Sequence, residues 1–101
     1  MQISGIPSNN ENDFLISVKG RFDFNAAPLF RDTYEKTSTQ PKCYIIDLKE
    51  AEYLDSTALG VLLSLREHAI RQHSAVKIIN CNKDVAKILN VTKLDQLFLI
   101  E

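Results

Sequence analysis

The chain has 101 residues, of which 45% are hydrophobic and 25% are charged, and its formal net charge is -1. This composition is typical of a soluble globular protein, and we expect a single domain over residues 1–101. A nearly neutral chain lacks the basic surface of nucleic-acid-binding proteins, so we expect no nucleic-acid partner. No apolar run approaches about 18 residues, and the first residues do not resemble a signal peptide, so we expect a cytoplasmic protein without a membrane partner.

An opening pair of strand-like segments is followed by alternating helices and strands. Strands are predicted where β-branched and apolar residues form short runs, which are residues 2–6, 14–18, 42–48, 76–81 and 97–100. Helices are predicted where apolar residues recur at helical spacing, which are residues 25–35, 56–72 and 84–90. This order predicts an α/β domain with an opening hairpin, a mixed β-sheet and helices packed mainly on one side.

Several boundaries of these elements rest on single residues. Asn25 is the expected N-cap of the first helix and Asp84 that of the third, because short polar side chains accept from free N–H groups at a helix start. Gly20 is expected to end the second strand or to bend it. Pro41 follows a polar loop and excludes a continuation of the first helix.

Residues 53–60, Tyr-Leu-Asp-Ser-Thr-Ala-Leu-Gly, join a buried-strand pattern to the longest helix pattern. Asp55, Ser56 and Thr57 can each cap this helix, and the loss of such a cap costs about 0.5–2 kcal/mol. A hydroxyl at a helix N-terminus can also carry a phosphate, because that end attracts anions. Gly60 costs up to about 1 kcal/mol relative to Ala, which indicates either close packing on the sheet or close approach by another molecule.

Other kinds of site find little support. His68 lies about 18 Å from Ser56 at the ~1.5 Å rise of a helix, which argues against a Ser/His/Asp triad. Cys43 and Cys81 have no metal-ligand spacing with each other or with a histidine, and we expect buried free thiols. There is no Gly-rich phosphate loop. We therefore expect no catalytic residue, no metal, no cofactor and no enzymatic activity.

The motif Asp55-Ser56-Thr57-Ala58-Leu59-Gly60 after a buried strand resembles the central segment of a STAS domain, the fold of bacterial anti-sigma factor antagonists. Gly20-Arg21-Phe22-Asp23 stands where that family carries a Gly-x-Leu-Asp-like segment before its first helix. The order of elements also matches over nearly the whole chain. Two motifs in register, separated by about thirty residues, make the resemblance more specific than either alone.

The resemblance implies a switch controlled by phosphorylation. In the family, the serine that matches Ser56 is phosphorylated by an anti-sigma factor that is also an ATP-dependent serine kinase. The unphosphorylated antagonist binds this partner and releases its sigma factor, and a PP2C-type serine phosphatase restores the active form. Thr57 is the second candidate acceptor. The partner-binding residues that the resemblance implies are Asp23, Asp55, Ser56, Thr57, Ala58 and Gly60.

Two residues depart from the family pattern. Ala58 stands where the family usually has Gly, which is expected to alter a close approach by the kinase. Arg21 stands where antagonists often carry Glu, which changes the local charge by two units. These departures leave an alternative open, in which the domain regulates biofilm or polysaccharide formation or is an accessory subunit of a lipid ABC transporter. Neighbouring genes for a kinase and phosphatase, or for transporter components, would distinguish the two.

Overall fold

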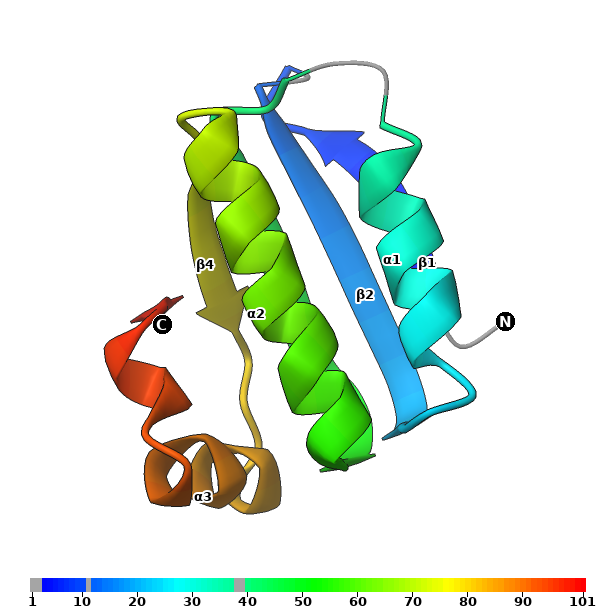
Figure 1. The fold of residues 1–101 in the computed structure, drawn as a ribbon, viewed down its shortest axis with the longest axis vertical. Coiled ribbons are helices and arrows are strands. Elements are labelled where there is room, and N and C mark those ends of the chain that lie inside the picture. The colour runs from blue at the N-terminus through cyan, green and yellow to red at the C-terminus, as the bar shows by residue number, and fades with distance from the viewer. Residues whose placement is uncertain (1–2, 11, 38–39) are drawn as a thin grey trace.

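The computed structural model describes residues 3–10, 12–37 and 40–101. Over these residues the chain forms a mixed sheet with strand order β1-β2-β3-β4-β5. The strands are β1 (Ile3–Ser8), β2 (Asp13–Phe22), β3 (Cys43–Leu54), β4 (Ala75–Ile79) and β5 (Leu99–Ile100). The helices are α1 (Ala27–Glu35), α2 (Ser56–Arg71), α3 (Lys83–Val91) and the 3₁₀-helix η1 (Leu94–Gln96). In Figure 1 the helices α1 and α2 lie in front of this sheet. The strand β1 pairs antiparallel with β2, and all other neighbouring strands are parallel.

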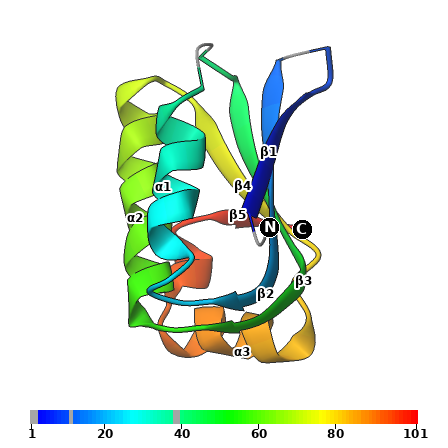
Figure 2. The same ribbon diagram turned by 90° about the vertical axis from the view of Figure 1, so that its right-hand side faces the viewer.

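The core lies between the sheet and the two helices α1 and α2, which cover the same face (Figure 2). Alternate residues of the central strands point into it, because side chains of a strand alternate between its two faces; Ile16, Val18 and Ile46 are at most 1% exposed. Phe30 of α1 is fully buried, and its ring lies 5.1 Å from that of Phe22. The predicted fold class and the predicted order of elements are confirmed.

The strands β2 and β3 extend beyond their predicted ends and curve toward the starts of the helices (Figure 2). Their pairing register shifts between Ser17 and Lys19 and again between Gly20 and Arg21. Gly20 has φ 81°, which glycine adopts without the strain that a side chain would bring. Gly20 therefore bends the strand, which was one of the two predicted outcomes. Because β2 and β3 are parallel, the β2–α1 and β3–α2 connections leave the sheet at the same end.

The start of α1 differs from the prediction. Its N-cap is Ala26, which makes no side-chain cap hydrogen bond, so the expected cap at Asn25 is wrong. The backbone carbonyl of Asp23 instead accepts from the N–H groups of Ala26 and Ala27, at 3.0 and 2.9 Å. A tight backbone turn after β2 thus satisfies the N–H groups that a side-chain cap would otherwise serve.

The C-terminal elements also differ in detail. The N-cap of α3 is Asn82, not Asp84, because the Asn82 side chain accepts from the N–H of Val85 at 2.9 Å. The predicted strand over residues 97–100 is shorter, and η1 precedes it. Phe98 is buried and contributes to the core, so its apolar character reflects packing and not strand pairing. Residue 2 of the first predicted strand, residue 11 of the predicted turn and residues 38–39 of the predicted loop lie outside the described residues.

Candidate functional site

The β2–α1 connection and the start of α2 are joined by two hydrogen bonds across the bent end of the sheet. The backbone N–H of Asp55 donates to the carbonyl of Phe22 at 3.2 Å. The backbone N–H of Phe24 donates to Asp55 Oδ2 at 3.1 Å, although the two residues are 31 positions apart. Segments that carry both parts of the family-like pattern are therefore in direct contact.

Asp55 is the N-cap of α2. Its backbone is extended, and its Oδ1 accepts from the N–H of Ala58 at 2.9 Å and from the hydroxyl of Thr57 at 2.6 Å. The Thr57 hydroxyl holds the pKa of the Asp55 carboxyl below its usual value, and the N–H groups of Ala58 and Phe24 act in the same direction. The carboxylate is therefore ionised at neutral pH. Of the three residues that the sequence offered as a cap, the structure assigns the role to Asp55.

Ser56 is the first residue of α2, and it is exposed. Among the described residues, its hydroxyl makes no hydrogen bond to the protein, whereas the hydroxyl of exposed Thr57 donates to Asp55. Ser56 thus has no capping role to lose. Its Oγ is a free, solvent-facing hydroxyl at the positive end of a helix of 16 residues.

A mostly apolar groove opens between α1 and α2 beside Thr57, with a volume of about 540 Å³. We call it the α1–α2 groove; both helices line it, and so does Phe24 of the connection before α1. Phe24 is 65% exposed, at the edge of this mostly apolar lining. Phe24 was not among the site residues expected from the sequence.

Gly60 lies on the groove side of α2 and is exposed. A Cβ built at Gly60 would meet no other atom within 4 Å. Close packing of α2 on the sheet therefore does not require this glycine. Of the two explanations drawn from the sequence, close packing on the sheet is wrong. Open space above the backbone at Gly60 is the condition that close approach by another molecule would need.

The substitution Gly60→Ala is expected to raise the free energy of unfolding by about 0.5–1 kcal/mol, because Ala loses less backbone entropy in a helix and its methyl group enters open space. Urea denaturation followed by circular dichroism measures this change. Gly5→Ala is the matched control, since a Cβ there would lie 2.6 Å from carbon atoms of Phe14 and Thr33 and should destabilise the fold. A less stable Gly60→Ala protein would contradict the open environment of Gly60.

Asp23 lies in the β2–α1 connection, next to Phe24, whose N–H donates to Asp55. Its Oδ1 accepts from the N–H of Asn25 at 3.0 Å, and Arg21 Nε lies 3.7 Å from its Oδ2. The guanidinium of Arg21 also lies over the ring of Tyr53, 4.9 Å from its centroid. Arg21, the departure from the family pattern, is therefore anchored twice and compensates part of the charge of Asp23.

Ala58, which we expected at the partner surface, is fully buried. Helical spacing places it on the sheet-facing side of α2 together with Val61, Leu62 and Leu65. Its methyl group packs in the core, so the side chain cannot contact a partner, and the expected effect of Ala58 on an approaching kinase has no structural basis. The other expected residues of this surface are accessible, Ser56, Thr57 and Gly60 more than Asp23 and Asp55.

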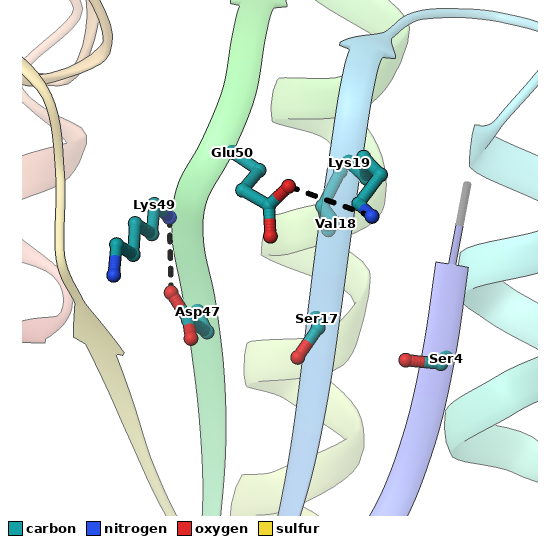
Figure 3. Close-up of a pocket in the computed structure, with 7 residues that line it drawn as sticks. All are labelled: Ser4, Ser17, Val18, Lys19, Asp47, Lys49 and Glu50. Carbon is teal, nitrogen blue, oxygen red and sulfur yellow. Dashed lines mark hydrogen bonds and ion pairs between the residues drawn. The ribbon is translucent and has the colours of Figure 1, made fainter.

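A second, smaller hollow of about 150 Å³ lies on the open face of the sheet, opposite α1 and α2 (Figure 3). Its charged side chains make contacts within the hollow. Asp47 accepts from the backbone N–H of Lys49 at 2.9 Å, and Lys19 pairs with Glu50 at 3.5 Å.

In the part of the chain that the structure describes, there is no candidate metal site and no activated thiol. No group of three or more His, Cys, Asp or Glu side chains there could hold a metal ion. Cys43 and Cys81 are half-buried instead of fully buried, and burial raises the pKa of both thiols, so they are protonated at neutral pH. Within the same residues, no helix has the length and apolar character needed to cross a membrane.

The family model of the STAS domain matches residues 6–101. The chain belongs to the STAS domain family. This STAS domain is 44% identical over 100 residues to the STAS-domain containing protein PA14_20770 of Pseudomonas aeruginosa (strain UCBPP-PA14), and the match covers 99% of both chains. It is 29% identical over 94 residues to the anti-sigma-B factor antagonist of Bacillus subtilis (strain 168), covering 93% of this chain and 86% of the relative.

Solved structures share the fold of this STAS domain. An anti-sigma factor antagonist from Mycobacterium paratuberculosis superposes with a TM-score of 0.80 at 21% identity, over 97% of this chain and 84% of the other. The Bacillus cell fate determinant SpoIIAA in its phosphorylated form superposes with a TM-score of 0.75 at 14% identity, over 98% and 90% of the two chains. One relative, from Bacillus subtilis, and the fold neighbour from Mycobacterium paratuberculosis are thus anti-sigma factor antagonists.

Proposed function

We propose that this STAS domain is an anti-sigma factor antagonist controlled by phosphorylation of Ser56. The unphosphorylated form binds an anti-sigma factor that is also a serine kinase, and the sigma factor is thereby released. Phosphorylation abolishes this binding, and a PP2C-type phosphatase restores it. The Bacillus subtilis relative, named an anti-sigma-B factor antagonist, supports the kind of partner. The phosphorylated form of SpoIIAA supports the kind of control.

The observation that carries the proposal is the division of roles at the start of α2. Asp55 caps the helix, and Ser56 presents an exposed hydroxyl without a hydrogen bond to the described part of the chain. A phosphate on Ser56 therefore removes no cap, and the helix N-terminus tolerates its charge. Thr57 is less suited as acceptor, because its hydroxyl already donates to Asp55.

The modification changes charge without requiring a change of fold. The γ-phosphoryl group passes from ATP to Ser56 Oγ: the bond from phosphorus to the ADP oxygen breaks, the bond to Oγ forms, and the hydroxyl proton leaves to a base or to water. The product carries about -1.5 to -2 charges next to the ionised Asp55. A partner docked over this end would have to bury that charge against carboxylates, and a hundredfold loss of affinity needs only about 2.7 kcal/mol.

Incubation with the anti-sigma factor kinase of the same organism and ATP tests the acceptor. The wild-type protein is expected to gain one phosphate, mapped to Ser56 by mass spectrometry of its peptides, and Ser56→Ala to gain none. Thr57→Val, which keeps the size of the side chain, should still be phosphorylated. A phosphate that remains on Ser56→Ala would assign the acceptor elsewhere, and an unmodified wild-type protein would overturn the proposed control.

A further inference from the structure

We propose that Asp55 couples the phosphorylation state of Ser56 to the position of Phe24, so that a phosphate on Ser56 loosens the hydrogen bond from Phe24 to Asp55 and displaces the exposed ring at the α1–α2 groove. The inference rests on the proposed function, because it takes Ser56 as the phosphate acceptor. It adds a regulatory role for a residue that a capping function alone would explain. Asp55 acts as a positioning residue, and Phe24 is the group that it positions.

The two carboxylate oxygens of Asp55 hold different segments. Oδ1 accepts from Thr57 and Ala58, both in the first turn of α2. Oδ2 accepts from the N–H of Phe24, which belongs to the connection between β2 and α1. A cap needs only the first set of contacts. The contact with Phe24 makes the same carboxylate a bridge between the residue before Ser56 and the mouth of the groove.

Phe24 lies at the surface and not in the core. Its side chain is 65% exposed, whereas the ring of Phe22, two residues earlier, is fully buried. Phe24 lines the α1–α2 groove together with Thr57 and Gly60 of α2. The hydrogen bond from its backbone N–H to Asp55 ties the connection that carries Phe24 to the start of α2.

A phosphate on Ser56 acts on this bridge through charge and through competition. The phosphate carries about -1.5 to -2 charges. These charges lie on the residue next to Asp55 and repel its ionised carboxylate. The phosphate oxygens also compete for the N–H groups of the first turn of α2. The contacts of Asp55 with Thr57 and Ala58 lie within that turn, where the helix keeps donor and acceptor close. The bond to Phe24 comes from a separate segment, so it lengthens without unwinding α2.

The experiment needs no partner protein. Phosphoserine is introduced at position 56 during translation, and the backbone amide of Phe24 is followed by NMR in the full chain. We expect its rate of exchange with solvent to rise roughly tenfold, equivalent to about 1.4 kcal/mol, together with shifts of its aromatic resonances. Phosphoserine at position 4, an exposed serine on the open face of the sheet, adds the same charge elsewhere and should leave Phe24 unchanged.

Asp55→Asn provides the second arm. Asn keeps a carbonyl oxygen for the cap, but its NH₂ group replaces Oδ2 and cannot accept from Phe24. We expect this variant to show fast exchange at Phe24 without phosphate and little further change when position 56 carries phosphoserine. Unchanged exchange and resonances of Phe24 in the phosphorylated wild-type chain would overturn the coupling, while the proposed function would stand on direct repulsion of the partner. A chain that the kinase does not modify would overturn the proposed function even if the synthetic phosphoprotein shows the coupling.

Discussion

Phosphorylation of Ser56 is expected to weaken binding to the anti-sigma factor roughly hundredfold, which corresponds to about 2.7 kcal/mol. Ser56→Asp, with one charge in place of nearly two, should reproduce at least a tenfold loss, or about 1.4 kcal/mol. Ser56→Ala should bind like the unphosphorylated protein and no longer respond to the kinase. The reason is local: the hydroxyl is exposed, and the carboxylate of the neighbouring Asp55 is already ionised.

Stability separates this loss of binding from a loss of fold. Asp in the first turn of a helix interacts favourably with the helix dipole. The free energy of unfolding of Ser56→Asp should therefore lie within about 0.5 kcal/mol of the wild-type value. Isothermal titration calorimetry with the purified anti-sigma factor measures the affinity. Ser4→Asp adds the same charge on the open face of the sheet and should bind normally. Equal affinities of Ser56→Asp and wild type would contradict the proposed phosphorylation switch. If both proteins instead bound ABC-transporter components equally well, the accessory-subunit alternative would be favoured.

The order of elements could be read from the sequence because the strands and helices bury apolar side chains in regular patterns. Their ends were less readable. The strand β3 continues to Leu54 through exposed charged residues, where no apolar run marks it. The cap of α2 was one of three adjacent polar residues, and the extended backbone of Asp55, with the hydrogen bond it accepts from Ala58, distinguishes it from Ser56. Local composition names candidates for such a role, whereas backbone conformation selects among them.

The candidate site shows the same limit. The family motif pointed to Ser56 and Asp23, and the parallel pairing of β2 with β3 brings their two segments together. Phe24 could not be found in this way, because its contact with the site is a backbone hydrogen bond to a residue 31 positions away. The burial of Ala58 was readable in principle, since it shares helical spacing with Val61, Leu62 and Leu65.

Asp55→Ala is expected to lower the free energy of unfolding by about 2 kcal/mol, at the upper end of the range for an N-cap, because the N–H of Ala58 and the N–H of Phe24 both lose their acceptor. Ser56→Ala, one residue later, should change stability by less than about 0.5 kcal/mol. Asp55→Asn should lie between the two, because it keeps the cap and loses the contact with Phe24. Urea denaturation at neutral pH measures all three.

The difference in the free energy of unfolding between wild type and Asp55→Ala should depend on pH. This dependence would identify the ionised carboxylate of Asp55 as the source of the difference. Hydrogen bonds from Thr57, Ala58 and Phe24 lower the pKa of Asp55 in the folded state, so the unfolded state binds its proton more readily. The stabilisation is therefore fully present above the unfolded pKa of about 3.9 and is lost as the pH falls through the lower folded pKa. The comparison of wild type with Asp55→Ala isolates the contribution of this one carboxylate. Their stability difference should be constant from pH 7 to about pH 5 and shrink below about pH 4, whereas a difference that is independent of pH down to pH 2 would contradict a role for the charge of Asp55.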